Sequence, residues 1–319
     1  MITVIGCGRW GSCIAWYLDK IGNDVYLYGR KASKHMQAFQ ETRSNGMLVL
    51  PESVKLVTSL APSIEASNRI VISVGAQNLR SLLKELQGYS LKNKTFILCM
   101  KGIEIGTGER LSQIAKAVLG ENNQIAVWLG PGHVQEFFRG IPNCMVIDSD
   151  DQATKDTLIQ DFSSPLIRFY YGDDLIGNEI GAAAKNVIGI AAGMLDGLDL
   201  SSLKGALMSR GTREVSRLIA AEGGKERTAY GLCHLGDYEA TVFSQFSNNR
   251  CFGEKYVKGE SFDKLAEGYY TVQALIESSE RLHIDLPICQ AVYDVLYHKA
   301  DPRETLDGLF KRGLKPEYW

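Results

Sequence analysis

The residue with the clearest chemical potential is Lys185, which lies in a long apolar stretch. It is the one charged residue between Ile180 and Leu195, among alanine, isoleucine, valine, glycine and methionine. An alanine-rich run of this length is helical by propensity, and a helix that is apolar on nearly every side is a buried helix. Burial lowers the pKa of an amine, so a lysine in such a helix can serve as a proton donor or acceptor. The alternative is a lysine whose stem follows the apolar surface and whose amine stays in water.

Two further groups of interest follow predicted strands. Lys101 comes directly after the apolar segment Thr95 to Met100, and the turn Gly130-Pro131-Gly132-His133 follows the segment Ile125 to Leu129. Ligands of open α/β sheets bind at the carboxyl ends of the strands. A cation at Lys101 suits an anionic substrate or a carbonyl that is being reduced, although a lysine at a strand end is often simply solvated.

Polar side chains also gather in two stretches after the apolar helix. The first runs from Gly231 to Thr241 and the second from Ser247 to Gly253. We expect both to be loops near the lysine-bearing helix, where they could line a polar pocket or merely cap turns. The candidate pocket residues are Asp237, Thr241, Ser247, Asn248, Asn249 and Arg250.

The first 30 residues have the pattern of a dinucleotide-binding unit. A short apolar strand, Ile2 to Ile5, precedes Gly6-Cys7-Gly8-Arg9-Trp10-Gly11, and a predicted helix over Ser12 to Ile21 and a strand over Asp24 to Tyr28 follow. In this fingerprint the first glycine permits a tight turn, the second admits the pyrophosphate and the third lets the helix approach the strand. The pyrophosphate then rests on the helix N-terminus.

The residues after the second strand favour NADP over NAD. An NAD enzyme usually places Asp or Glu there to bind the ribose 2′-hydroxyl. This chain instead reads Tyr28-Gly29-Arg30-Lys31, so that Arg30 and Lys31 could bind a 2′-phosphate. We therefore expect NADP as the preferred cofactor and NAD as a possible one. A solvated basic turn is the alternative.

The remaining pattern predicts two domains. Further strands are expected at Arg69 to Val74, Thr95 to Met100, Ile125 to Leu129, Cys144 to Ile147 and Ile167 to Tyr171, at intervals that fit parallel α/β units. Beyond residue 178 only helical segments follow, at Asn178 to Leu198, Leu203 to Glu222, Ser261 to Leu282, Leu286 to His298 and Pro302 to Phe310. The predicted fold is an α/β Rossmann domain with a mostly parallel sheet over 1–177, followed by an all-α domain over 178–319.

Composition narrows the class of function. The 319 residues are 45% hydrophobic with a net charge of -2, an ordinary globular profile without a basic field for nucleic acid. Seven scattered cysteines, none in a C-x-x-C pair, predict free thiols in a reducing cytoplasm and no metal cluster. The chain has no apolar run of about 18 residues for a membrane span, and a strand starting at Ile2 leaves no room for a signal peptide. We expect a cytoplasmic protein that acts on a small molecule.

Together these motifs resemble the NAD(P)-dependent glycerol-3-phosphate dehydrogenases of the bacterial type, from Ile5 to about Tyr297. The matching motifs are G-x-G-x-W-G at 6–11, K-G at 101–102, G-P-x-H at 130–133, E-I-G-A-A-A-K-N-V-I-G-I-A-A-G-M at 179–194, R-G-x-x-E at 210–214, L-G-D at 235–237, S-x-N-R-x-F-G at 247–253, E-G-Y at 267–269 and L-P-I at 286–288. The resemblance implies a Rossmann domain, then a helical one. The implied activity is the reversible reduction of dihydroxyacetone phosphate to sn-glycerol 3-phosphate for phospholipid synthesis.

The resemblance also implies roles. The family's catalytic lysine matches Lys185, the aspartate of its G-L-G-D loop matches Asp237, and its K-G lysine, placed between nicotinamide and substrate, matches Lys101. Thr241 matches a threonine near the substrate and Glu267 an acid close to the cofactor. Hydride transfer to the ketone carbon would be assisted by a proton from Lys185, with Asp237 holding the lysine. The full expected set is Lys101, Gly130, Gly132, Asn186, Thr241, Ser247, Asn248, Asn249 and Arg250 for the substrate, and Gly6, Gly8, Arg9, Trp10, Gly11, Arg30, Lys31, Lys101, Asn248 and Glu267 for the cofactor.

Two positions depart from the family pattern where the substrate would be held. The family usually reads S-R-N-R where this chain has Asn248, and an amide cannot offer a charged fork to a phosphate. It usually has Ser or Thr where this chain has Gly132. A smaller change, apart from these two, is that the family's G-L-G-D-L loop reads H-L-G-D-Y here, which brings His234 nearby. Asn248 and Gly132 therefore leave two alternatives: an oxidoreductase of the same fold for another hydroxy or keto compound, phosphorylated or not, and an NADP-binding regulatory protein without catalysis. By analogy with other helical second domains, we expect a homodimer.

Overall fold

The computed structural model describes residues 1–314 and 316–317. The chain divides into two compact units, residues 1–102 with 109–179, and residues 103–108 with the chain from 180 onward. The main division lies two residues after the predicted boundary at 177. The sequence did not predict that 103–108 belong to the second unit, where the backbone N–H of Gly106 donates to the carboxylate of Glu277, 2.8 Å away.

The first unit is built on one sheet in the order β3-β2-β1-β4-β5-β6-β7-β8, as the Rossmann prediction required. Its neighbouring strands are parallel except for β6 and β7, which are antiparallel. The strands are β1 (Ile2–Ile5), β2 (Val25–Tyr28), β3 (Lys55–Val57), β4 (Arg69–Ile72), β5 (Thr95–Leu98), β6 (Gln124–Leu129), β7 (Asn143–Ser149) and β8 (Ile167–Tyr171). The mostly parallel sheet is confirmed.

Two details of this sheet differ from the sequence prediction. Strand β7 was expected to be parallel to β6, but the connection between them carries only the short helix α6 (Val134–Phe138), too short to return the chain along the strand. Strand β3 was not predicted, because it is three residues long at the sheet edge and none of them is fully buried. Such a strand has no apolar run from which it could be predicted.

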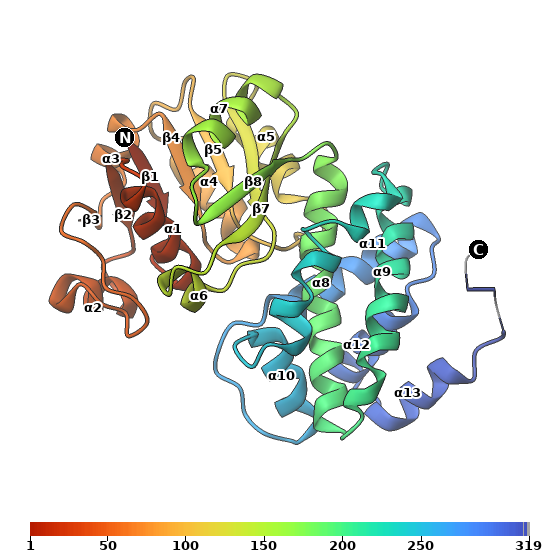
Figure 1. The fold of residues 1–319 in the computed structure, drawn as a ribbon. Coiled ribbons are helices and arrows are strands. Elements are labelled where there is room, and N and C mark those ends of the chain that lie inside the picture. The colour runs from red at the N-terminus through yellow and green to blue at the C-terminus, as the bar shows by residue number, and fades with distance from the viewer. Residues whose placement is uncertain (315, 318–319) are drawn as a thin grey trace. The chain divides into compact units, whose positions relative to one another are not determined.

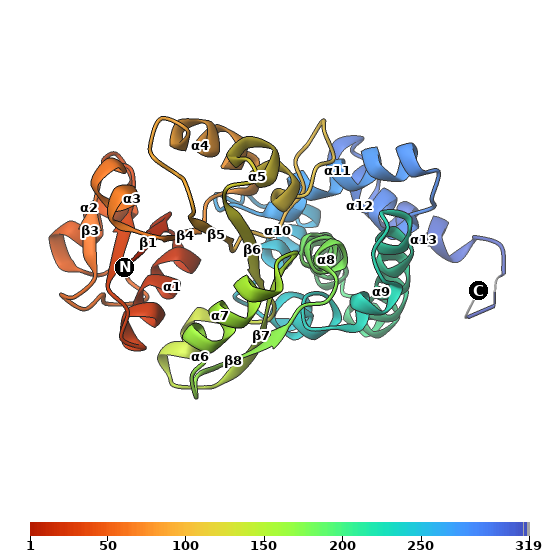
Figure 2. The ribbon, with the colours of Figure 1, turned by 90° about the horizontal axis from the view of Figure 1, so that it is seen from above.

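Helices cover both faces of the sheet. Figure 2 shows α4 and α5 on one face and α1, α6 and α7 on the other. The helices are α1 (Arg9–Lys20), α2 (Lys34–Thr42), α3 (Ala61–Ala66), α4 (Leu79–Leu86), α5 (Leu111–Leu119), α6 (Val134–Phe138) and α7 (Gln152–Phe162). At the core lies Trp128, fully buried with the rings of Tyr17, Phe162 and Phe169 around it. The sheet is thus held between two layers, and the carboxyl ends of its strands are left to loops.

The second unit is helical and centres on α8, which α9 and α10 flank in Figure 1. Its helices are α8 (Leu175–Gly197), α9 (Lys204–Ala221), α10 (Asn248–Val257), α11 (Glu267–Leu282), α12 (Pro287–Tyr297) and α13 (Pro302–Phe310). Helix α10 corrects the predicted loop over Ser247 to Gly253. The side chain of Ser247 accepts the backbone N–H of Arg250 and so caps a helix whose polar first turn looks like a loop in the sequence.

Small residues of α8 bring neighbouring backbone close, as expected. A Cβ placed on Gly193 would lie 1.9 Å from the backbone carbonyl oxygen of Arg250, and one on Gly189 would lie 2.7 Å from the side-chain methyl of Thr241. Gly268 of α11 likewise sits against the backbone of Asn186, where a Cβ would lie 2.6 Å from the carbonyl oxygen. Larger residues at these positions would push α10 and α11 off the central helix. Among the described residues, no helix is both long and apolar enough to cross a membrane.

Candidate active site

The glycine loop after β1 has the shape that a dinucleotide needs. Gly6 has φ of +113°, and a Cβ there would lie 2.1 Å from the carbonyl oxygen of Ser73. A Cβ on Gly11 would lie 1.9 Å from the carbonyl oxygen of Gly6, whereas above Gly8 nothing lies within 4 Å. The first turn of α1, which starts at Arg9, contains no acidic residue that would repel an anion. Open space over Gly8 at a helix N-terminus fits a pyrophosphate.

Four further residues expected at the cofactor, Arg9, Trp10, Arg30 and Lys31, lie in or near this loop. Arg30 and Lys31 follow the end of β2 and are both exposed. Arg9 donates to the side-chain oxygen of Gln135 at 2.7 Å, and the ring of Trp10 lies 6.3 Å from that of Phe137, centroid to centroid. Two exposed cations at the strand end are consistent with binding a 2′-phosphate.

Lys101 and Gly130, predicted separately at two strand ends, are in contact. The amine of Lys101 donates to the carbonyl oxygen of Gly130 at 2.8 Å. Gly130 has φ of +117°, a left-handed conformation that favours glycine, and the half-buried lysine follows β5 while the glycine follows the neighbouring β6. The structure therefore places one ammonium group at the carboxyl edge of the sheet, where ligands of this fold bind.

The departure at Gly132 has a packing explanation. A Cβ at this position would lie 2.8 Å from the ring of Phe137 and 3.2 Å from the ring of Trp10. A serine or threonine would therefore have to displace an aromatic side chain that is itself packed in the unit. Packing against these two rings therefore explains the glycine without a change of substrate.

Lys185 is buried in α8 and paired. Its amine lies 2.8 Å from a carboxylate oxygen of Asp237 and donates to the hydroxyl of Thr241 at 2.6 Å. The hydroxyl of Thr241 donates in turn to the backbone carbonyl of Asp237 at 2.7 Å. Lys185 is only 6% exposed, so its amine does not extend into bulk water. Its carboxylate partner Asp237 is fully buried too, so each charge offsets the cost of burying the other.

The segment that carries Asp237 is not the open loop predicted. Residues Leu235–Asp237 form a 3₁₀ turn and Glu239–Phe243 a single π-helical turn. Two of its buried side chains, His234 and Tyr238, were given no role in the sequence analysis. The ring of His234 is hydrogen-bonded at both nitrogens, to the backbone carbonyl of Gly181 and to the hydroxyl of Tyr238.

Asn186, the neighbour of Lys185, joins three helices. Its side-chain oxygen accepts from the amide of Asn249 in α10 at 3.0 Å, and the oxygen of Asn249 accepts the backbone N–H of Gly268 in α11 at 2.9 Å. Glu267, the acid expected near the cofactor, is the first residue of α11. The two asparagines thus hold α10 and α11 against α8, a structural role that is separate from any contact with a ligand.

The side chains of Asn248 and of the nearby Arg250 are both engaged by groups of their own unit. The amide of Asn248 donates to the backbone carbonyl of Leu265 at 3.0 Å. The guanidinium of Arg250 is paired with the carboxylates of Asp196 and Glu254 and also donates to the carbonyl of Ser244. Arg250 is therefore held in place by its own unit and is not poised to supply the charge that Asn248 lacks.

Comparison with known proteins identifies the family. The family model "NAD-dependent glycerol-3-phosphate dehydrogenase N-terminus" matches residues 1–155, and the model of the C-terminus matches residues 174–307. A glycerol-3-phosphate dehydrogenase (NAD(P)+) of Pelodictyon phaeoclathratiforme is 34% identical over 99% of both chains. The chain belongs to this family.

Further relatives agree with that membership. A glycerol-3-phosphate dehydrogenase (NAD(P)+) of Clostridium botulinum is 34% identical over 99% of this chain and 98% of the relative. The crystal structure of the glycerol-3-phosphate dehydrogenase of Coxiella burnetii matches with a TM-score of 0.91 and 28% identity, over 98% of each chain. The glycerol-3-phosphate dehydrogenase resemblance, its Rossmann-plus-helical fold and its class, an NAD(P)-dependent oxidoreductase, are confirmed.

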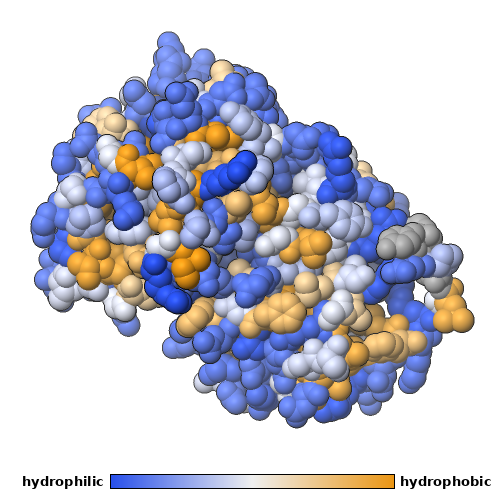
Figure 3. Space-filling view, viewed as in Figure 1, coloured by the Kyte–Doolittle hydropathy of each residue, from blue (hydrophilic) through white to orange (hydrophobic). Residues whose placement is uncertain are grey.

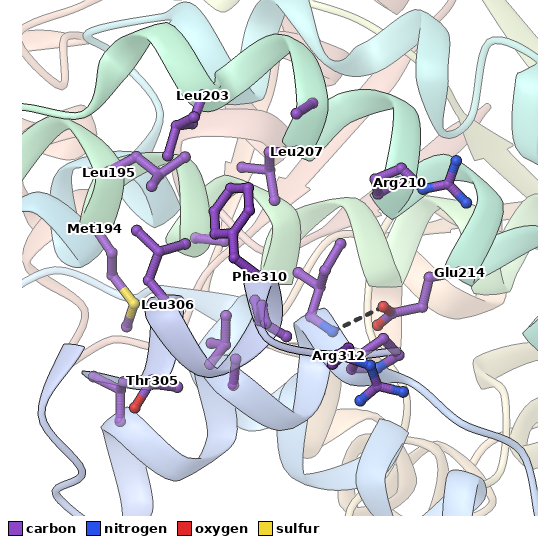
Figure 4. A pocket seen from close by; sticks show the side chains of 18 of the residues that line it. Met194, Leu195, Leu203, Leu207, Arg210, Glu214, Thr305, Leu306, Phe310 and Arg312 are labelled. Atoms are coloured by element: carbon purple, nitrogen blue, oxygen red, sulfur yellow. Dashed lines mark hydrogen bonds between the residues drawn. The ribbon is translucent and has the colours of Figure 1, made fainter. Parts of the chain in front are cut away.

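The helical unit of this glycerol-3-phosphate dehydrogenase family member also holds an apolar cavity of about 570 Å³. Figure 4 shows apolar side chains such as Leu195, Leu306 and Phe310 gathered at one end, with Arg210, Glu214 and Arg312 toward the other. Figure 3 shows apolar surface over the region of α13, where Phe310 is exposed. None of the residues predicted for catalysis, substrate or cofactor lines this cavity. Among the described residues, no group of three or more His, Cys, Asp or Glu side chains could hold a metal ion.

Proposed function

We propose that this protein catalyses the reversible reduction of dihydroxyacetone phosphate to sn-glycerol 3-phosphate, with NADPH preferred over NADH. The observation that carries the proposal is the buried Lys185–Asp237 pair, 2.8 Å apart, with Thr241 bonded to both residues. Family membership over nearly the whole chain supports the same activity, because the matched relatives carry that name.

The proposed role of Lys185 is to supply a proton. When bound, the nicotinamide cofactor supplies the hydride for the ketone carbon. The ammonium of Lys185 stabilises the oxygen of that ketone as it gains negative charge and transfers a proton to it. Asp237 pairs with the buried amine and Thr241 orients it. General acid catalysis of this kind contributes typically 10² to 10⁴ in rate.

We assign cofactor binding to the glycine loop and the cations that follow β2. Gly6, Gly8 and Gly11 would hold the pyrophosphate, and Arg30 and Lys31 the 2′-phosphate of NADP. The support is the open space over Gly8 and the absence of an acid in the segment Tyr28 to Lys31. For the substrate we assign Lys101, with its amine at the end of β5.

One observation favours a second candidate, a related hydroxy or keto compound without a triose phosphate. Asn248 replaces a family arginine, and Arg250 is tied to Asp196 and Glu254, so the second unit offers less cationic charge to a phosphate. A panel of phosphorylated and unphosphorylated ketones, assayed with NADPH and with product identification by mass spectrometry, separates the two. Turnover restricted to dihydroxyacetone phosphate supports the first, and faster turnover of an unphosphorylated ketone contradicts it.

We further propose that the enzyme works in the cytoplasm as a homodimer. The scattered cysteines, all free among the described residues, suit a reducing compartment. Sedimentation velocity of the purified protein at micromolar concentration tests the dimer. A monomer at every concentration would contradict it.

A further inference from the structure

His234 and Tyr238 form a hydrogen-bonded pair in the segment that carries Asp237. Both side chains are fully buried, with ring centroids 4.9 Å apart and planes inclined at 66°. The hydroxyl of Tyr238 lies 2.7 Å from Nε2 of His234, and Nδ1 of the same ring lies 2.8 Å from the carbonyl oxygen of Gly181. The two rings thus link the Asp237 segment to α8.

The carbonyl of Gly181 fixes which atom is the donor in each of these two hydrogen bonds. A backbone carbonyl can only accept, so Nδ1 of His234 carries the hydrogen. Burial, with a smaller contribution from the charge of Lys185, lowers the pKa of His234 to about 4, so the ring is neutral at pH 7. In the neutral ring Nε2 is an acceptor, and the hydroxyl of Tyr238 donates to it.

The His234–Tyr238 pair is joined to the backbone near both groups proposed for catalysis, Lys185 and Asp237. Gly181 lies one turn before Lys185, and in an α-helix the carbonyl of residue i is the partner of the amide of residue i+4. The backbone N–H of Asp237 donates to the carbonyl of His234 at 3.0 Å. A Cβ on Gly181 would lie 3.0 Å from the Cβ of His234, so a larger residue at this position of the helix would crowd His234.

The two residues are also the two positions at which this segment departs from the family pattern. The usual G-L-G-D-L reads H-L-G-D-Y here, and glycine and leucine side chains cannot form hydrogen bonds of this kind. The hydrogen bond between the two replacements makes them one feature. The side chain of Tyr238 is packed further among Ile188 and Val242, which leaves the ring little freedom.

We propose that His234 and Tyr238 are positioning residues that fasten the Asp237 segment to α8 and so hold the amine of Lys185 in place for proton transfer. The catalytic part of this inference rests on the proposed function, whereas the fastening itself does not. Small displacements of a catalytic group have large effects on rate, on the order of 10²-fold for 1 Å. The pair therefore matters for turnover more than for substrate affinity.

The test uses full-length protein with Tyr238→Phe, His234→Gly, the double variant His234→Gly/Tyr238→Leu, and Tyr256→Phe as a matched control. Tyr256 also donates a hydroxyl hydrogen bond within the second unit, to the carbonyl of Val295. Reductive methylation followed by mass spectrometry measures how fast the amine of Lys185 reacts. The methylation rate of Lys204, another buried lysine paired with an aspartate, is the internal reference. Steady-state kinetics give kcat and KM.

We expect Lys185 to react several-fold faster in Tyr238→Phe and His234→Gly than in the wild type, with Lys204 unchanged. The kcat should fall by about tenfold with KM nearly constant, and the double variant should be no worse than the poorer single one, because either change already breaks the pair. Tyr256→Phe should match the wild type. A Lys185 rate equal to that of the wild type in both single variants overturns the proposal. The methylation result stands even if dihydroxyacetone phosphate is not turned over, which would instead refute the proposed function.

Discussion

Lys185 of α8 and Asp237, 52 positions later in the chain, form a buried ion pair with 2.8 Å between amine and carboxylate. Neither partner would be stable alone, because an unpaired charge in an apolar helical core is costly. If the pair stood alone, a purely structural role would be enough to explain it. Its position on the family's lysine and aspartate motifs, with the hydroxyl of Thr241 bonded to both residues, supports the catalytic role proposed for Lys185.

Breaking the pair from one side should destabilise the protein. Asp237→Asn leaves the buried ammonium without its carboxylate, and we expect the free energy of unfolding to fall by about 3–5 kcal/mol. Urea unfolding followed by circular dichroism measures this, with the exposed Asp263→Asn as control, expected within about 0.5 kcal/mol of the wild type. Replacing both partners in Lys185→Met/Asp237→Leu should recover most of the loss. A double variant as unstable as Asp237→Asn would contradict the ion-pair explanation.

The cations after β2 should select the cofactor. We expect Arg30→Ala/Lys31→Ala to raise KM for NADPH roughly tenfold or more while KM for NADH changes little, because each lost hydrogen bond to a charged group is worth about 1.5–3 kcal/mol. Lys92→Ala, which removes an exposed lysine before β5, controls for net charge. An equal loss for both cofactors would show that the two residues act on the fold and not on the 2′-phosphate.

Restoring the family arginine should reveal how the substrate phosphate is held. If dihydroxyacetone phosphate is the substrate and Asn248 is a tolerated variation, Asn248→Arg should raise kcat/KM about tenfold through a bidentate phosphate contact. Asn248→Lys, which brings charge without the planar fork, should gain less. No gain from either variant would mean that other residues already bind the phosphate fully.

Stability should depend on pH through His234. Its pKa is lowered from 6.5 to about 4 by burial, with Lys185 lowering and Asp237 raising it, so between these values the unfolded chain binds a proton that the folded chain does not. The stabilisation that the folded state gains from a neutral His234 is therefore complete above about pH 6.5. As the pH falls toward 4, the free energy of unfolding decreases by up to roughly 3 kcal/mol. The unfolding free energy of His234→Gln, measured over the same range, should fall less than that of the wild type. Parallel curves would contradict a buried neutral histidine.

Much of the fold could be predicted from local pattern. The glycine loop, β1 and the apolar helix around Lys185 are continuous in sequence, so spacing alone indicates them. Strand β3 and helix α10 escaped prediction because an edge strand is half-solvated, and because the first turn of α10 is held by a cap at Ser247 and not by apolar spacing. The antiparallel β7 depends on the path of a connection, which periodicity does not encode.

The site shows the same limit. Lys185 could be singled out as a lone charge in an apolar helix. Asp237 could be named from the sequence as one of several candidate pocket residues, but its pairing with Lys185 came only from resemblance, because no local pattern links residues this far apart. The bond from His234 to Gly181 joins positions 53 apart and has no sequence signal beyond the unusual H-L-G-D-Y. Gly132 looked like a substrate-site change, whereas packing against Phe137 and Trp10 accounts for it.

The role of Lys185 is tested by NADPH oxidation with dihydroxyacetone phosphate, measured for the wild type and for Lys185→Ala, and by fluorescence titration of NADPH binding to both. We expect rapid turnover by the wild type and a loss of about 10²-fold or more in kcat for the variant, with the dissociation constant of NADPH nearly unchanged. A Lys185→Ala enzyme that turns over at the wild-type rate would contradict the mechanism proposed for this helix.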